Sequence, residues 1–391
     1  MKRSKAFGGL IFLAVLLMAW PVLAADAVRG VSDTEIQIGQ WGPQTGPAAL
    51  WGAVARGTDL LVKHVNDKGG VHGRQIKYYL RDDGYNPAKT KAIAKELVEN
   101  IGVFGVVDGV GTGPGMAVRD YLMENNVIWV APSTGSTHWT EPFQKNIFAA
   151  YPLYKDDGYL LTKYAWENIG KKIAIFYQND DYGKEGVIGV EKYLKEQGST
   201  LAAQVAVEVP DTDLSSHALK LKQSEADVVI MFLLPKHAAI ILGECAKIGY
   251  KPQWISCTTL SDGPMMFKIT KGLWKGVITS NFGVSVDSKM PLVEEYRAAQ
   301  QKFAPNERWG TFYLAGLVYL EPMLEGFQRT GRDLNPESFI KAMETLKDWQ
   351  GIGPPLTYTA DDHLGCKSVL MLKAGDEGVM TEISDWITIS K

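Results

Sequence analysis

The feature that most constrains the fold is an alternation of short apolar runs with longer segments of helical periodicity, which begins near residue 35 and continues for most of the chain. Apolar runs that end in Gly, Pro or Thr loops are typical of β-strands buried on both faces, as in parallel sheets covered by helices on each side. The first series of predicted strands comprises residues 35–38, where polar and apolar residues alternate with the period of a strand, and residues 75–80, 103–107 and 127–131. The second series comprises residues 173–177, 202–207, 228–233 and 254–256. Two such series predict an α/β fold with two doubly wound parallel-sheet lobes.

Helices are predicted between these strands and in the less regular C-terminal part. Asn86 is a suitable N-cap and Pro87 a suitable first-turn residue, so we expect a helix from there to about residue 100. In the second series, helices are predicted at residues 154–168, 185–197, 215–223 and 236–248. Beyond residue 277 we expect two long helices and three strands, the helices at 291–303 and 312–328 and the strands at 356–358, 368–372 and 386–389.

The N-terminus has the pattern of a secretory signal peptide. Three basic residues lie within the first five positions, residues 10–20 are apolar, and small residues precede a predicted cleavage site after Ala24. The apolar run is too short to cross a bilayer, which needs about 20 residues. We therefore expect residues 1–24 to be removed and the mature chain to be periplasmic, soluble near the membrane and not spanning it.

Length, charge and cysteine content limit the classes of function. A chain of 391 residues is long enough for about two domains. The formal net charge is −3, and −6 without the predicted signal peptide, so there is no basic excess with which to bind nucleic acid. An odd number of cysteines leaves at least one thiol unpaired, and buried thiols are favoured over a disulfide between Cys245 and Cys257, with Cys366 the third cysteine.

The motifs of common catalytic sites are missing from the sequence. It contains no P-loop, no Gly-x-Ser-x-Gly nucleophile motif and no His-Glu-x-x-His zinc motif, and its six histidines are not spaced like metal ligands. The pair Asp180 and Asp181 follows a predicted strand, and we interpret it as a helix cap at the edge of a cleft rather than as paired catalytic acids. We therefore expect a binding protein without cofactor or metal, not an enzyme.

The loops after the predicted strands are the candidate ligand-binding positions, because open parallel sheets bind ligands beyond the carboxyl ends of their strands. In the first series these loops are rich in Gly, Ser and Thr, notably at residues 112–113 and 133–136. Hydroxyls and free backbone N–H groups at a helix N-terminus suit a carboxylate or another small anion. The alternative is that these residues only cap helices and form turns.

Several segments together resemble the type I periplasmic binding proteins, which are the branched-chain amino acid-binding components of ABC transporters. Near the N-terminus, Gly-Pro-Gln-Thr-Gly-Pro at residues 42–47 is followed by Val-Asn-Asp-Lys-Gly-Gly-Val-His-Gly-Arg at 65–74 and by Arg-Asp-Asp-Gly-Tyr-Asn-Pro at 81–87. The second half contains two further similar segments, at 177–184 and 272–280. The resemblance covers nearly the whole predicted mature chain.

The resemblance implies two lobes joined by three chain crossings, with the ligand in the cleft and the lobes closing over it by a hinge motion. The crossings are expected near residues 147–152, 278–283 and 348–356. The first lobe would comprise residues 33–149 and 282–350, and the second lobe residues 150–281 and 351–391.

The resemblance also implies a ligand site. Backbone amides and hydroxyls of the first lobe would hold a carboxylate, and the residues at these positions are Thr112, Gly113, Thr134, Gly135 and Ser136. From the second lobe, Tyr182 would close over the ligand, and Asp262 would either pair with a ligand ammonium or cap the following helix. Trp51, Leu234 and Thr259 complete the expected walls, with ordinary packing as the alternative for Trp51.

The function implied by the resemblance is that of a monomeric periplasmic solute-binding protein that delivers a small carboxylate-bearing ligand to the permease of an ABC importer. Leucine, isoleucine or valine is the default ligand, an aromatic or other apolar carboxylate is the alternative, and urea or short amides are a further option. A second class of function is an exported sensor domain that presents its bound state to a receptor. An enzyme is the third class, against which the missing nucleophile and metal motifs argue.

Overall fold

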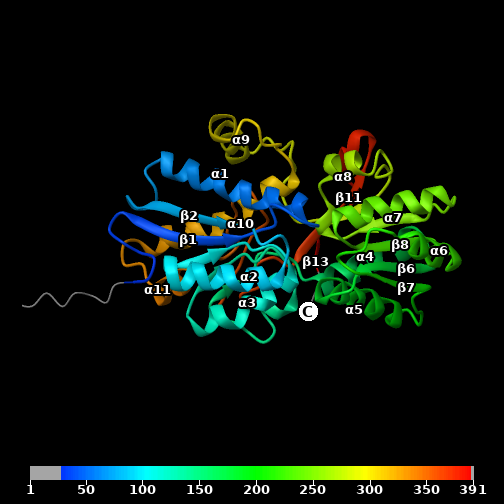
Figure 1. Cartoon of the computed structure of the whole chain (residues 1–391), viewed down its shortest axis with the longest axis horizontal. Coiled ribbons are helices and arrows are strands. Elements are labelled where there is room, and N and C mark those ends of the chain that lie inside the picture. Colours follow the sequence, from blue (N-terminus) through cyan, green and yellow to red (C-terminus); the bar gives the residue numbers. More distant parts are fainter. Residues whose placement is uncertain (1–27, 389–391) are drawn as a thin grey trace, which may run out of the picture.

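Two α/β lobes lie side by side along the long axis of the protein in the computed structural model, which describes residues 28–388 (Figure 1). The predicted signal peptide lies outside the described residues. Between residues 28 and 388 no helix combines the length and the apolar character that a membrane crossing needs. The two-lobed α/β architecture predicted from the alternating pattern is confirmed.

The first lobe contains a five-stranded parallel sheet in the order β2-β1-β3-β4-β5. Its strands are β1 (Glu35–Trp41), β2 (Gln75–Arg81), β3 (Gly105–Val107), β4 (Ile128–Val130) and β5 (Ile147–Phe148). Ile36 and Ile38 belong to the core cluster that contains α1 (Ala53–Asp67) and α10 (Thr311–Thr330). Val106 belongs to the cluster with α2 (Pro87–Lys95) and α3 (Thr112–Glu124). Because helices cover both faces, the inner strands β3 and β4 contain only apolar residues and glycine, whereas the edge strand β2 keeps polar and charged side chains.

Helices α1 and α10 touch through two glycines. A Cβ atom on Gly57 of α1 would lie 1.9 Å from the carbonyl oxygen of Tyr313, and one on Gly316 of α10 would lie 1.9 Å from that of Val54. The hydroxyl of Thr58 donates to the carbonyl oxygen of Gly316 at 3.3 Å. A side chain at either glycine would force the helices apart, so only glycine allows this close packing of two segments that are distant in sequence.

The second lobe contains an eight-stranded mixed sheet in the order β12-β11-β10-β9-β8-β6-β7, with β13 paired to β11. Its parallel strands are β6 (Ile173–Gln178), β7 (Ala203–Val207), β8 (Val228–Phe232), β9 (Gln253–Ser256) and β10 (Ile278–Asn281). Antiparallel pairing adds the C-terminal strands β11 (Ser368–Ala374), β12 (Met380–Glu382) and β13 (Ile387–Thr388).

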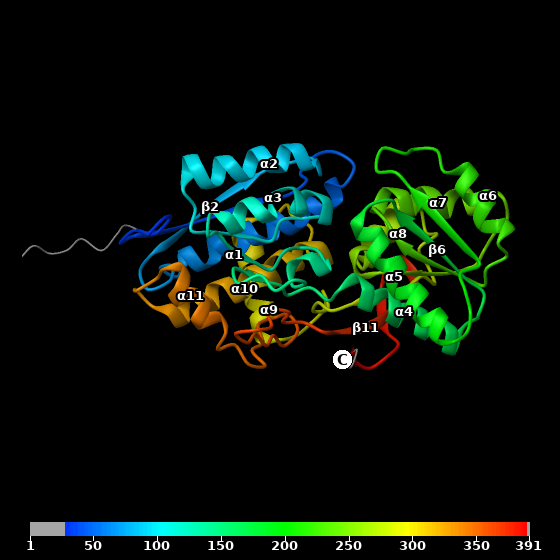
Figure 2. The same cartoon turned by 90° about the horizontal axis from the view of Figure 1, so that it is seen from below.

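Two helical layers enclose this second sheet, as Figure 2 shows. One face packs against α4 (Tyr154–Asn168) and α5 (Asp181–Glu196), which share a core cluster with alternate strand residues such as Ile175. The other face packs against α6 (Ser215–Gln223), α7 (Pro235–Lys247) and α8 (Gly263–Ile269), which share a cluster with Phe176. Successive residues of one strand therefore enter different cores, as the two-residue period of a strand requires.

Side-chain caps explain where two of the helices begin. The side chain of Asn86 accepts hydrogen bonds from the backbone N–H groups of Ala88 and Lys89, which confirms its predicted role as an N-cap. The side chain of Asp180 likewise accepts from the N–H of Gly183 at 3.3 Å. The cap interpretation of Asp180 is therefore confirmed, and α5 begins at residue 181 rather than at the predicted residue 185.

Between residues 28 and 388 the chain passes from one lobe to the other after β5, after β10 and after residue 364. Residues 349–364 stay with the first lobe, because Trp349 pairs with Leu356 and Leu364 pairs with Ala149 beside β5. The third crossing thus follows the 348–356 range that we expected. The strand predicted at 356–358 is wrong, since only an isolated bridge forms there. Pro354 and Pro355, which lack N–H donors, precede it.

The other helical elements of the described residues include α9 (Pro291–Phe303) and α11 (Pro336–Met343) of the first lobe, and the π-helix η2 (Glu96–Ile101), which continues α2. The short 3₁₀ helices are η1 (Ala49–Gly52), η3 (Thr137–Trp139), η4 (Thr258–Leu260) and η5 (Asp376–Gly378). The prediction for the cysteines is confirmed, because Cys245, Cys257 and Cys366 are all free and buried. Burial raises the pKa of each thiol to about 12, so each is protonated at neutral pH.

Candidate functional site

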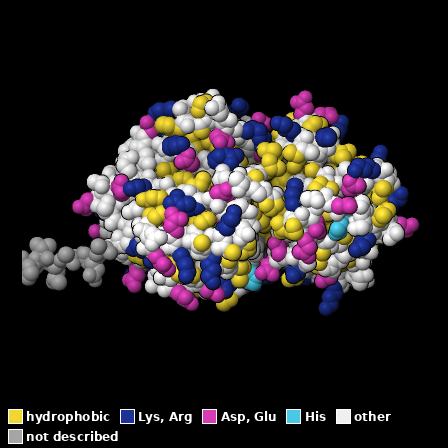
Figure 3. All heavy atoms as spheres, viewed as in Figure 1, with side chains coloured by type: hydrophobic (Ala, Val, Ile, Leu, Met, Phe, Trp, Pro, Cys, Tyr) yellow, Lys and Arg dark blue, Asp and Glu magenta, His cyan; other side chains and the backbone are white. Residues whose placement is uncertain are grey.

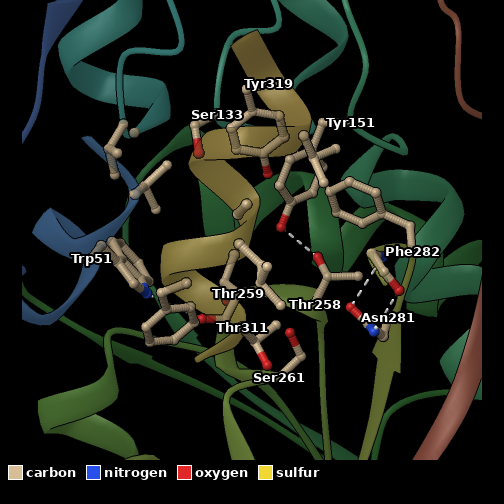
Figure 4. A pocket seen from close by; sticks show the side chains of 18 of the residues that line it. Trp51, Ser133, Tyr151, Thr258, Thr259, Ser261, Asn281, Phe282, Thr311 and Tyr319 are labelled. Atoms are coloured by element: carbon tan, nitrogen blue, oxygen red, sulfur yellow. Dashed lines mark hydrogen bonds between the residues drawn. The ribbon is translucent and has the colours of Figure 1, made fainter. Parts of the chain in front are cut away.

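A pocket lies where the carboxyl ends of the strands in the two sheets face each other (Figure 4). It spans about 750 Å³, including the space at its mouth. The first lobe contributes η1, the loops after β2, β3 and β4, and the start of α10. The second lobe contributes the starts of α4 and α5 and the loop after β9, and two of the chain crossings complete the wall. The pocket is therefore a site between lobes, at the edge where parallel sheets bind ligands.

Aromatic side chains are the largest side chains of the pocket wall. Eight of the lining residues are aromatic, namely Trp51, Tyr85, Tyr151, Tyr154, Tyr182, Phe282, Phe312 and Tyr319. All but Phe312 pack on another of these rings, with ring centroids 4.8 Å apart for Tyr154–Tyr182 and 4.6 Å apart for Tyr151–Phe282. Large rings held by neighbouring rings make a rigid wall that suits a planar or bulky apolar ligand.

Trp51 joins the two lobes at one side of the pocket. Its ring meets that of Tyr85 edge-on at a centroid distance of 5.8 Å. Its indole Nε1–H donates to the backbone carbonyl of Thr259, in the second lobe, at 3.1 Å. Figure 4 shows Trp51 on one side of the pocket and Phe282 on the opposite side. An apolar group between them would contact rings on both sides.

Hydroxyl groups are the main polar groups of the wall. The Tyr151 hydroxyl is hydrogen-bonded to the Thr258 hydroxyl, and the Tyr182 hydroxyl lies 2.6 Å from that of Thr259. Burial raises the pKa of Tyr151 and of Tyr182 well above the usual range, so both phenols are neutral. These groups offer hydrogen bonds to a ligand without offering charge.

Two long helices begin at the pocket. Helix α3 starts at Thr112 and helix α10 at Thr311, and both residues line the pocket. The first backbone N–H groups of a helix have no intrahelical acceptor, and the helix dipole makes them favourable partners for an anion. The hydroxyls of Thr112 and Thr134 lie 2.6 Å apart, which ties the start of α3 to the loop after β4.

No charged side chain lines the pocket within the described part of the chain. The carboxylates behind the wall are Asp157, which accepts from the backbone N–H of Thr258 at 3.3 Å, and Asp108, which is bonded to the amide of Gln40. Burial raises the pKa of Asp157 to about 7 and that of Asp108 well above its usual range. Both carboxyls therefore resist ionisation more than an exposed aspartate does.

Charged groups lie instead at the rim, where carboxylates of the second lobe reach the first lobe. Glu185 of α5 accepts from the Ser136 hydroxyl at 2.6 Å and from the N–H and hydroxyl of Thr137 at 3.0 and 3.1 Å. Asp262 is fully buried, caps α8 by accepting from Met265 N–H at 3.1 Å, and forms an ion pair with Arg308 of the first lobe. These contacts connect the lobes independently of any ligand.

The structure brings four of the ten predicted site residues into the pocket wall: Trp51, Thr112, Tyr182 and Thr259. It places the other six behind the wall or at the rim. Ser136 bonds Glu185, Thr134 bonds Thr112, and Asp262 is occupied by its helix cap and by Arg308. The remaining three are backbone or core positions, namely Gly113 in the first turn of α3, Gly135, whose carbonyl accepts from Tyr154 N–H, and the buried Leu234.

Sequence reasoning did not single out several residues of the wall. Tyr151, Asn281 and Phe282 lie in two of the predicted chain crossings, so aromatic and amide side chains at those crossings were an available signal. Tyr85 follows β2 in a segment that we used only for the resemblance. Tyr319 lies in the third turn of α10, and no local pattern indicates that this part of a long helix faces the cleft.

Comparison with known protein families matches residues 35–378 to the family described as "Periplasmic binding protein". Among curated proteins, the Leu/Ile/Val-binding protein homolog 2 of Brucella abortus (strain 2308) is 31% identical over 235 residues, which are 60% of this chain and 63% of that protein. That alignment spans less than two thirds of the relative's length. The homolog 1 of the same organism is 26% identical over 361 residues, 91% of this chain and 92% of that protein.

Solved structures of the same fold bind different ligands. A branched-chain amino acid ABC transporter protein of Thermus thermophilus with bound valine has a TM-score of 0.84 at 17% identity, covering 92% of this chain and 98% of that chain. An ABC transporter solute-binding protein of R. palustris in complex with 4-hydroxybenzoate has a TM-score of 0.78 at 21% identity, covering 90% and 97%. At these identities the likeness establishes the fold.

Proposed function

The chain belongs to the periplasmic binding protein family, and we propose that it is the exported solute-binding component of an ABC importer, which captures one small organic ligand between its lobes and presents it to a permease. The observation that carries this proposal is the pocket itself, since residues of both lobes and of two chain crossings line it. A ligand that touches both walls stabilises the closed arrangement of the lobes and so marks the loaded protein for its partner.

We propose that the ligand is a small carboxylate with an apolar body. The curated relatives are named for leucine, isoleucine and valine, and two neighbours of the same fold hold valine and 4-hydroxybenzoate. The start of α3 and the hydroxyls of Thr112 and Ser133 would hold the carboxylate, in the manner of an anion at a helix N-terminus. The aromatic wall would bury the body of the ligand.

Each predicted wall residue then has a role in this proposal. Trp51 would cover the ligand from the first lobe and Tyr182 from the second lobe. Thr112 would donate a hydrogen bond to the ligand carboxylate. Thr259 would hold the two covering rings in place, the Trp51 ring through its carbonyl oxygen and the Tyr182 ring through its hydroxyl. The protein would release its ligand unchanged, act as a monomer and need no cofactor.

A ligand screen by thermal shift tests the proposal. Amino acids, aliphatic acids, aromatic acids and short amides would be screened at 1 mM on the mature protein, and hits would be measured by calorimetry. We expect a tight ligand to raise the melting temperature by several degrees, because binding to the folded state adds to its stability. Loss of that shift in the Thr112→Val variant would assign it to the cleft. Unchanged ligand affinity in Thr112→Val, or turnover of the ligand, would contradict the proposal.

A further inference from the structure

We propose that the ligand is an aromatic monocarboxylate that carries no ammonium group. This inference rests on the proposed function and deepens it by naming the class of ligand. It separates this pocket from one built for an α-amino acid, which must satisfy a carboxylate and an ammonium at once.

The first argument is the charge of the wall. None of the described residues that line the pocket carries a carboxylate, so an ammonium inside would be removed from water without an opposing charge. Burial of a cation is costly unless an anion and hydrogen-bond acceptors accompany it. Two acceptors of the wall are already used, since Thr259 O accepts from Trp51 Nε1 and Gly283 O accepts from Asn281 Nδ2.

The second argument is that the nearby carboxylates are engaged elsewhere. Asp262 caps α8 and pairs with Arg308, and Asp180 caps α5 and bonds the amide of Gln178. Asp157 lies behind Thr258 and accepts from its backbone N–H. None of the three lines the pocket, and Asp180 and Asp262 would each have to give up a partner to reach an ammonium there. Burial raises the pKa of Asp157 and of Asp108, the other carboxyl behind the wall, so both resist the ionisation that an ammonium partner needs.

The third argument is the shape of the apolar walls. Phe282 and Tyr319 lie nearly parallel, with centroids 6.4 Å apart and an interplanar angle of 27°, and Trp51 lies across the pocket from Phe282 (Figure 4). A planar ring between these walls could stack on one side and meet ring edges on the other, which are the favourable geometries of aromatic pairs. A branched aliphatic side chain would fill the space without these contacts.

The fourth argument is that the polar groups of one end suit an anion. Figure 4 shows the hydroxyls of Ser133 and Tyr319 directed into the same end of the pocket, and Thr112 at the start of α3 also lines it. Hydroxyl and N–H groups can donate to a carboxylate, and each donor–carboxylate bond is stronger than a bond between neutral groups. A ligand with a carboxylate at one end and a ring at the other matches both halves of the pocket.

Two matched ligand pairs test the inference on the unmodified mature protein. Phenylalanine and 3-phenylpropanoate differ only by the ammonium, as do leucine and 4-methylpentanoate. By calorimetry at pH 7 we expect 3-phenylpropanoate to bind at least 100-fold more tightly than phenylalanine, and more tightly than 4-methylpentanoate. If phenylalanine or leucine binds as tightly as its partner, the inference is overturned while the proposed function stands. If no acid or amino acid binds, both are overturned.

The Asn281→Asp variant tests the reason for the preference. Asp has nearly the size of Asn, and Asn281 lines the pocket, so this change adds one negative charge to the wall. We expect binding of 3-phenylpropanoate to weaken at least 10-fold and the ratio between the members of each pair to fall. Asn168→Asp, at the C-terminal end of α4 and outside the pocket lining, is the matched control. An unchanged ratio in a folded Asn281→Asp protein would show that wall charge does not select the ligand.

Discussion

The interior and the rim of one cleft use polar residues in opposite ways. The interior is neutral and aromatic, and its hydrogen-bonding groups are hydroxyls, amides and backbone groups. The rim contains Glu185 and Asp262, two buried carboxylates of the second lobe that meet donors on the first lobe. Figure 3 shows hydrophobic side chains gathered along the junction of the lobes, with charged side chains spread over the outer surface.

This difference separates two tasks that a closing cleft must perform. Contacts at the rim hold the lobes together whatever lies inside, because their partners are all residues of the chain. The interior walls carry no charged side chain, so the contacts that a ligand makes with these walls determine how much it stabilises the closed form. The comparison predicts that interior substitutions change which ligands bind, whereas rim substitutions change how readily the lobes close on any ligand.

The largest expected effect is on the pH dependence of the free energy of unfolding, and it comes from Asp157, the carboxylate just behind the interior wall. Its pKa is raised by burial from 3.8 to about 7, so the folded state binds the proton more tightly than the unfolded chain. The contribution of Asp157 to stability is therefore fully present below about pH 4 and is lost, by roughly 4 kcal/mol in all, as the pH rises to 8, at about 1.4 kcal/mol per pKa unit. Chemical denaturation at several pH values should show that Asp157→Asn removes this part of the pH dependence.

Two features of the chain sharpen that measurement. Burial also raises the pKa of Glu321 in α10 to about 7. Glu321 therefore also lowers the free energy of unfolding as the pH rises, and the Asp157→Asn variant retains this part of the pH dependence. Asp376→Asn, at a carboxylate that is 80% exposed, is the control and should follow the unmodified protein. An identical pH profile for Asp157→Asn and the unmodified protein would mean that no buried charge forms behind the wall.

The next effect concerns Trp51, which belongs to both regions because its ring lines the interior and its N–H bonds the second lobe. Trp51→Ala should weaken ligand binding about 100-fold, or about 3 kcal/mol, since a central aromatic anchor is lost. Trp51→Phe retains a ring but removes the donor to Thr259, and should cost about 10-fold. Calorimetry on both variants measures the two contributions, and equal losses would show that the ring itself adds nothing.

A smaller effect is expected from the rim residue Glu185. Glu185→Ala leaves the Ser136 hydroxyl and the Thr137 N–H without their acceptor, so closure should become less favourable by about 1.5 kcal/mol and every ligand should bind about 10-fold more weakly. Glu191→Ala, at an exposed position of the same helix, is the control. Losses that differ from ligand to ligand would contradict the separation of rim and interior.

The smallest effect is expected from Asp262→Asn. The amide retains an oxygen that can cap α8, whereas the oxygen that pairs with the half-exposed Arg308 and accepts from Phe312 N–H at 3.4 Å is replaced. Binding should weaken by about 3-fold at most, equally for an amino acid and for the acid that lacks its ammonium. A selective loss for the amino acid, measured by calorimetry, would place Asp262 in the site as an ammonium partner.

Much of the fold was predictable because strands buried on two faces and helices with capped ends leave strong local patterns. Ile173–Gln178 and Val228–Phe232 are almost uniformly apolar, and the Asn86 cap with Pro87 marks a helix start. The packing of α1 on α10 was not predictable, since it depends on Gly57 meeting a helix that comes much later in the chain. The segment after Trp349 was misread because apolar residues behind two prolines mimic a strand.

Two of the four predicted residues that line the pocket follow strands, whereas Trp51 and Tyr182 were expected from the family resemblance alone. Thr112 and Thr259 are the two that follow strands. Ser136 also follows a strand, but its hydroxyl meets Glu185 across the cleft, and sequence does not reveal a partner that is 49 residues away and on the other lobe. Tyr319 enters the pocket from a helix, where the choice of face depends on tertiary packing.

The contact between α1 and α10 has a consequence for biosynthesis. The strands of the first sheet have all been synthesised once residue 148 is made, but α10 is complete only at residue 330. The parallel strands of the second lobe, β6 to β10, are all made between these two points. They can therefore assemble while one face of the first sheet still lacks helix α10. Contacts over such long separations form slowly, and an uncovered sheet face is prone to aggregate, so a nascent chain of this topology is a natural client for a molecular chaperone.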